Sequence, residues 1–101
     1  MADRDAVREA ILTRLSTVMD PETRVDVVRM RLIEDLVVDA GGVARYKFRP
    51  SSPLCPLAVP LALSIREAVG QVEGVTGQEI EVVGYVGAAE LNAMLRETET
   101  E

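Results

Sequence analysis

The sequence predicts one small α/β (α+β) domain whose helices and strands follow the order α-β-β-α-β-α. Three observations support this fold class. The chain has 101 residues, enough for a single core. Two alternating apolar segments flank a Gly41-Gly42 turn signal, and apolar residues at helical spacing lie on both sides of them. We therefore expect a three-stranded mixed sheet with the helices packed on one face.

The N-terminal part predicts a helix and then a loop. Asp3 can cap a helix that runs to about Met19. Asp20-Pro21 stops this helix, since a residue before proline is pushed away from the α region. Residues 25–32 are expected to form a loop or short turn, and Ile33–Asp39 the first strand. The apolar stripe of the helix consists of Val7, Ile11, Leu12, Leu15, Val18 and Met19.

A hairpin follows, and its second strand, Val43–Arg49, alternates cleanly. Apolar side chains of this strand should face the helices, and basic side chains should form an outer face. The expected inner residues are Ala44, Tyr46 and Phe48, and the expected outer residues are Arg45, Lys47 and Arg49.

The C-terminal part predicts a second helix, a third strand and a third helix. Pro56 suits a first-turn position, but regular helix should begin only around Pro60 and end at Gly70. Residues 79–83 are predicted to form the third strand. Because a helix connects it to the hairpin, this strand could pair parallel to one of the other two. Residues 88–96 read as the last helix. The domain spans residues 1–101, with a core of about 4–96 and a frayed acidic tail at 97–101.

Composition narrows the function. Hydrophobic residues make up 48% of the chain but aromatic residues only 3%, so an aliphatic core favours a shallow site or subunit interface over a large cavity. The net charge of −6 disfavours nucleic-acid binding. The most apolar run, residues 54–63, is too short to span a membrane, and residues 1–9 lack a signal-peptide core. Together with the single cysteine, these features predict a soluble cytoplasmic protein.

Six of the eleven basic residues fall in the middle of the chain. One interpretation is a solvated surface of mixed charge. The other is a basic patch that docks an acidic partner or an anionic cofactor. The six residues are Arg24, Arg29, Arg31, Arg45, Lys47 and Arg49.

Cys55 is the only cysteine, and the chain has no histidine. A thiol near a helix N-terminus meets unpaired N–H groups and the positive end of the helix dipole, and both favour the thiolate. Such a residue can bind metal or sulfur, or act as a nucleophile. The alternative is a small buried hydrophobic side chain.

Two short segments bear polar groups at chain reversals, Asp20-Pro21-Glu22 and Ser51–Pro56. If they meet at one edge of the sheet, they combine two carboxylates, two hydroxyls and the Cys55 thiolate. Each segment also has a purely structural explanation. The first would be a helix stop and turn, and the serines would be helix caps.

The two segments in this order, with a leading helix and a hairpin between them, resemble the PaaD-like/SufT-like family of iron–sulfur cluster assembly proteins. The resemblance covers about residues 7–83 and implies an iron–sulfur-cluster-assembly-like domain. It implies a metal-binding role for Cys55. It also implies a supporting site, which consists of Asp20, Glu22, Ser51 and Ser52.

Two departures mark this chain as a divergent member. Arg29-Met30-Arg31-Leu32 stands where members have an Asp-Leu-Gly-Leu-like segment, so arginines replace the aspartate and the glycine. Gly84-Tyr85-Val86-Gly87 stands where many members have a Pro-Pro-Trp-like segment.

The resemblance implies a non-enzymatic maturation factor. Cys55 would transiently bind iron, sulfide or an iron–sulfur cluster and deliver it to client apo-proteins or assembly proteins, with no tightly bound cofactor. A homodimer would supply two thiolates. One alternative is an adaptor that docks partners through Arg45, Lys47 and Arg49 and the apolar residues 54–63. Another is a small thiol enzyme, which the absence of histidine disfavours.

Overall fold

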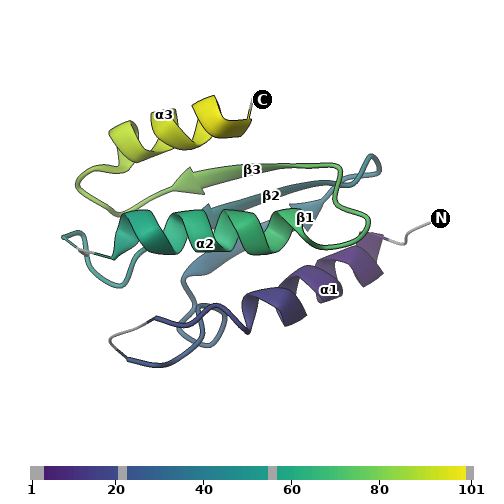
Figure 1. The fold of residues 1–101 in the computed structure, drawn as a ribbon, viewed down its shortest axis with the longest axis horizontal. Coiled ribbons are helices and arrows are strands. Elements are labelled where there is room, and N and C mark those ends of the chain that lie inside the picture. Colours follow the sequence, from purple (N-terminus) through teal and green to yellow (C-terminus); the bar gives the residue numbers. More distant parts are fainter. Residues whose placement is uncertain (1–3, 21–22, 55–56, 100–101) are drawn as a thin grey trace.

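The computed structural model describes residues 4–20, 23–54 and 57–99 (Figure 1). The helices and strands follow the predicted order. None of the helices in these ranges is long and apolar enough to cross a membrane. Their bounds are α1 (Arg4–Leu15), β1 (Ile33–Val38), β2 (Val43–Phe48), α2 (Ala58–Gly70), β3 (Gly77–Val82) and α3 (Ala88–Glu99).

The sheet is mixed, as predicted, and β2 is its central strand. It pairs antiparallel with β1 through the hairpin and parallel with β3. The parallel register is unbroken from Gly77 to Val82. The antiparallel register shifts between Glu34 and Val37, where β1 bulges. A β-bulge bends an edge strand and disrupts its ladder, so β1 is a poor template for a further strand.

α1 and α2 lie side by side on one face of the sheet (Figure 1). The inner residues predicted for β2, Ala44, Tyr46 and Phe48, are buried beneath them. On the opposite face the side chains of β2 and β3 are charged. The largest fully buried side chains are aliphatic apart from one phenylalanine: Phe48, Ile11, Leu15, Ile65, Leu95, Val27, Val69 and Val82.

α3 lies along the outer edge of β3 (Figure 1). The Asn92 side chain accepts a hydrogen bond from the Val82 N–H (2.7 Å) and donates one to the Val82 carbonyl (3.1 Å). Arg66 of α2 donates to the Leu95 carbonyl of α3 at 3.3 Å. With Leu91 also buried, α3 covers an edge that would otherwise present unpaired backbone groups.

The turn between β1 and β2 lies at one end of the molecule, which we call the turn end (residues 39–43 and 74–76). The Asp39 carboxylate accepts hydrogen bonds from the N–H groups of Gly41 (2.8 Å) and Val43 (3.0 Å). Gly42 has φ +87°, and its carbonyl accepts from the Thr76 N–H at 3.0 Å. The turn is therefore tied both to its own carboxylate and to the segment before β3.

The end predicted for the first helix is wrong. α1 ends at Leu15 rather than near Met19. The hydroxyls of Ser16 and Thr17 donate to carbonyls of the last helical turn, which ends the regular pattern. Met19 then forms an isolated antiparallel bridge with Asp26. The capping role predicted for Asp3 lies outside the described residues.

Other boundaries also differ from prediction. α2 begins at Ala58, before Pro60, because a proline in the first turn needs no N–H partner. β3 begins at Gly77 rather than Glu79, since pairing with β2 extends the ladder. α3 continues to Glu99, so helix occupies part of the predicted acidic tail. The strands of the hairpin agree with prediction to within one residue.

Candidate functional site

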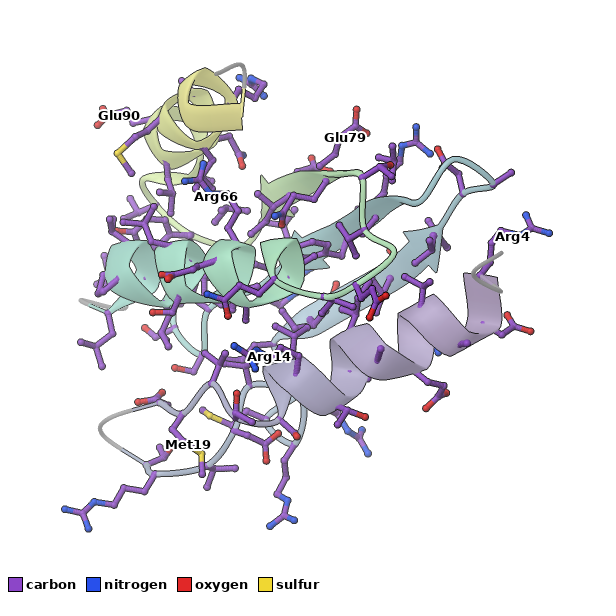
Figure 2. All side chains as sticks on the ribbon, turned by 45° about the vertical axis from the view of Figure 1, so that its right-hand side comes forward. Arg4, Arg14, Met19, Arg66, Glu79 and Glu90 are labelled. Atoms are coloured by element: carbon purple, nitrogen blue, oxygen red, sulfur yellow. The ribbon has the colours of Figure 1, made fainter. Side chains whose placement is uncertain are left out.

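Three loops meet at the end of the molecule opposite the turn end. We call this the loop end, and it comprises residues 16–20, 23–32, 49–54 and 83–87 (Figures 1 and 2). The Val86 N–H donates to the Pro53 carbonyl at 2.9 Å, which joins two of the loops. The Arg49 N–H donates to the Leu32 carbonyl at 2.8 Å and joins the third. The loops that contain the two predicted motifs thus share one end of the fold.

The loop after α1 forms a small hairpin-like excursion. The Val27 N–H donates to the Val18 carbonyl (3.0 Å), and the Asp20 N–H donates to the Val25 carbonyl (3.0 Å). Asp20 lies at the base of this excursion and is 3% exposed, the only charged residue buried to this degree in the described ranges. Glu22, the second predicted carboxylate, lies outside the described residues.

The second half of this loop is a single helical turn with a defined beginning and end. Asp26 begins it, since its carboxylate accepts the Arg29 N–H at 2.8 Å. The Arg31 N–H bonds to Val28 and the Leu32 N–H to Val27, both at 3.0 Å. This pair of bonds is the Schellman motif, which requires a left-handed residue and usually takes glycine there.

Arg31 occupies that left-handed position with φ +61°. The resemblance to the family predicts glycine at this point of the chain, and the geometry supplies the physical reason. Arg24 is also left-handed, with φ +58°. The resemblance to the family reveals that Arg31 replaces a glycine. Nothing in the sequence indicates that Arg24 is left-handed.

The loop before α2 contains the serines of the second motif. Ser51 and Ser52 are exposed, and the Ser52 hydroxyl accepts the Leu54 N–H at 3.2 Å. The N-cap residue of α2 is Leu57, with no side-chain capping bond and no acid in the first turn. The serines therefore do not cap α2, contrary to the structural alternative. Cys55 and Pro56 lie outside the described residues.

Apolar side chains are exposed at the loop end. Leu54 and Val86 are each 74% exposed, and Met19 is 54% exposed. The sequence marks residues 54–63 as the most apolar run but carries no signal that Met19 and Val86 are exposed. Part of that segment instead faces the core, because Ala58, Leu61 and Ala62 are buried.

The predicted basic face of β2 is present, but it is neutralised by neighbouring strands. Arg45 pairs with Asp39 (3.2 Å) and Glu79 (2.8 Å), and the bond to Glu79 raises the pKa of the Arg45 guanidinium. Lys47 and Arg49 each pair with a carboxylate of β1, at 3.5 Å and 2.8 Å. This face, with a groove of about 420 Å³ between the sheet and α3, has mixed charge.

In the described ranges, no group of three or more His, Cys, Asp or Glu side chains is arranged to hold a metal ion. Cys55 and Glu22 fall outside those ranges. The structure therefore positions Asp20, Ser51 and Ser52 at one end of the molecule and leaves the metal role of Cys55 as a prediction.

Curated relatives resemble this chain over most of its length. It is 38% identical over 92 residues to the uncharacterized protein MJ1129 of Methanocaldococcus jannaschii, covering 91% of this chain and 97% of the relative. It is 40% identical to an iron-sulfur cluster carrier protein of Deinococcus radiodurans, covering 82% of this chain but 23% of that protein. It is 30% identical to the Fe-S protein maturation auxiliary factor YitW of Bacillus subtilis, covering 78% of each.

Solved structures agree with the fold. A domain of unknown function from Bacillus anthracis superposes with a TM-score of 0.72 and 27% identity, covering 79% of this chain and 76% of that one. The sequence profile of a family described as iron-sulfur cluster assembly protein matches residues 8–82, from α1 through β3 and across both motifs. With this match and its relatives, the chain belongs to the iron–sulfur cluster assembly protein family.

Proposed function

We propose that this protein acts in the maturation of iron–sulfur proteins. In this proposal Cys55 transiently holds iron, sulfide or a cluster as cargo and delivers it to client apo-proteins. The observation that carries the proposal is the family match over residues 8–82, which includes both motifs. The names of relatives from Deinococcus radiodurans and Bacillus subtilis, a carrier and a maturation factor, support it.

The number of metal ligands in one chain favours a carrier over a redox enzyme. Iron–sulfur clusters commonly take four thiolate ligands, and one chain supplies a single cysteine and no histidine. Two chains would bring two Cys55 thiolates to one cluster, so homodimer formation is part of the proposal. Small thiols or the client would complete the shell, which keeps the cargo exchangeable.

The polar residues of the loop end would shape the site without acid–base catalysis. Asp20 would fix the loop from its buried position, and Glu22, Ser51 and Ser52 would offer oxygen acceptors or hydroxyl donors beside the thiolate. No acid in the first turn of α2 offsets the positive end of its dipole, which supports a thiolate at Cys55. A thiolate must stay reduced, so the cytoplasm is the proposed location.

The test is anaerobic reconstitution with ferrous iron and sulfide, followed by visible absorption and solution mass. Wild type should develop a sulfide-to-iron absorption band in a dimer, and Cys55→Ser should not. The loaded protein should then reconstitute an apo-ferredoxin. Equal absorption and equal transfer by Cys55→Ser would refute the carrier role, and Ser52→Ala serves as a matched hydroxyl control.

A second candidate is an adaptor without cargo, which would dock partners through Arg45, Lys47 and Arg49. A groove on this face supports the adaptor, since two of the three docking residues, Arg45 and Lys47, line it. Glu79 and Glu81 line it as well, so a partner segment would need both acidic and basic groups. In that case Arg45→Glu and Arg49→Glu should abolish partner capture, and Cys55→Ser should leave it unchanged. The opposite pattern would eliminate the adaptor.

A further inference from the structure

The six basic residues in the middle of the chain divide into two groups. The three on β2 and just after it are ion-paired with carboxylates at 2.8–3.5 Å. Of the three on the loop after α1, Arg24 and Arg31 form no ion pair with another described residue. Arg29 reaches Asp26 only at 4.0 Å, and its side chain is 81% exposed. Among these six residues, the accessible positive charge therefore lies on the loop after α1, which is part of the loop end.

Two of these arginines also have an unfavourable backbone conformation. Arg24 and Arg31 adopt left-handed conformations that strain any residue with a Cβ and leave glycine unstrained. Arg31 holds the Schellman position, where glycine would give the same hydrogen bonds. The fold alone does not account for arginine at these positions, since glycine would serve it better.

The apolar side chains nearby indicate the kind of partner. Leu54 and Val86 are 74% exposed on loops joined by the bond from Val86 to Pro53, and Met19 is exposed on the loop with the arginines. Figures 1 and 2 show these loops at the same end in both views. Exposed apolar side chains and arginines at the same end of a molecule are typical of protein–protein interfaces, in which arginine is enriched.

We propose that Arg24, Arg29 and Arg31 form a docking surface for an acidic segment of the client protein that receives the cargo. This inference rests on the proposed function, since it names the surface that brings a client to the Cys55 motif. A protein fits better than a nucleic acid or an anionic membrane. The chain as a whole carries a charge of −6, which repels an extended polyanion but permits a local acidic segment to reach one basic end.

The experiment measures binding of a fluorescent acidic apo-ferredoxin to the intact, cargo-free protein at low salt, alongside thermal unfolding. Arg31→Gly should weaken binding about 5-fold, since one accessible charge is lost. The same change should raise the unfolding midpoint by about 4 °C or more, because it relieves the left-handed strain. Binding should also fall as salt is added.

Two variants control for these changes. Arg31→Lys keeps the charge and the strain, so both its binding and its midpoint should stay near wild type. Arg4→Gln makes the same change in net charge at the first residue of α1, beside the turn end and far from Met19 (Figure 2), and should leave binding unchanged. Wild-type binding by Arg31→Gly, or equal weakening by Arg4→Gln, would overturn the proposal. A lower unfolding midpoint for Arg31→Gly would also overturn it, because Arg31 would then be structural.

Three further probes separate this inference from the carrier role and from other partners. Cys55→Ser should bind the apo-ferredoxin as wild type does, so docking can hold even if the carrier proposal fails. If docking does not depend on Arg31 while loading depends on Cys55, the docking surface is refuted and the carrier role stands. Arg31-dependent binding of duplex DNA or of phosphatidylserine vesicles, with no binding of the apo-ferredoxin, would overturn the choice of a protein partner.

Discussion

The two ends of this molecule meet the same backbone requirement with different residues. At the turn end the left-handed positions are Gly42 and Gly74, with φ +87° and +97°. At the loop end the left-handed positions include Arg24 and Arg31, with φ +58° and +61°. Glycine is unstrained in this region, and an arginine there costs about 1 kcal/mol or more.

The left-handed positions at the turn end carry glycine, the residue that the backbone conformation favours. Arginine at two left-handed positions of the loop end is not explained by the backbone conformation. At the turn end the side chains serve the turn itself, since the Asp39 carboxylate accepts two backbone N–H groups and Thr76 bonds to Gly42. At the loop end the side chains of Arg24 and Arg31 bond to no backbone group of the described residues, and their left-handed φ weakens the local conformation. Their charge is what distinguishes them from glycine.

The largest effect is expected for Gly42→Ala at the turn end. An alanine Cβ would lie 2.5 Å from the Gly74 carbonyl oxygen, a backbone atom that cannot move freely, and φ is left-handed as well. We expect the free energy of unfolding to fall by about 2–3 kcal/mol in urea denaturation. Gly41→Ala is the matched control, because its Cβ would meet only Asp39 Oδ1 at 3.4 Å and should cost little. A similar loss for both variants would contradict this account.

A smaller effect is expected for Gly84→Ala at the loop end. Gly84 is left-handed at φ +66°, but its added Cβ would meet the end of a flexible side chain, Arg49 Nη1, at 2.6 Å. The guanidinium can move away, so mainly the backbone strain remains, about 1 kcal/mol. Urea denaturation beside Gly42→Ala gives the comparison. A loss equal to that of Gly42→Ala would mean that the loop end is as rigidly packed as the turn end.

The smallest effect concerns the pH dependence of the turn end. The N–H groups of Val43 and Gly41, together with Arg45, hold the pKa of Asp39 below its ordinary value of 3.8. A carboxyl whose pKa is lowered by folding stabilises the folded state above its unfolded pKa and loses this contribution as the pH falls. Wild type should therefore lose more of its thermal midpoint between pH 5 and pH 3 than Asp39→Asn does. Parallel pH curves for the two proteins would exclude this role for Asp39.

Local patterns in the sequence were enough to predict the order of the elements. The alternation of Val43–Arg49 after two glycines predicts a hairpin, and the hairpin is confirmed. The predicted end of α1 was wrong because the actual end depends on contacts between residues that are not neighbours in the sequence. Val18 and Met19 fit the helical spacing but pair instead with Val27 and Asp26 across the loop.

The charges of β2 show the same limit. Alternation correctly predicts that Arg45, Lys47 and Arg49 share an outer face. It does not predict that Glu79 comes into register beside Arg45, because the parallel pairing of β2 with β3 joins residues far apart in sequence. Likewise, the replacement of a glycine at Arg31 was visible, but its left-handed conformation followed only from the hydrogen bonds around it.

The Asn92 side chain has a consequence for how this sheet can grow. Its amide offers one acceptor and one donor to Val82, the two groups that a neighbouring peptide unit would offer. One residue thereby acts as a substitute for a fourth strand. If this amide were replaced by an apolar side chain, the N–H and carbonyl of Val82 would lose these two bonds at the edge that α3 covers, and unpaired strand-edge groups are the feature through which sheets pair with further strands.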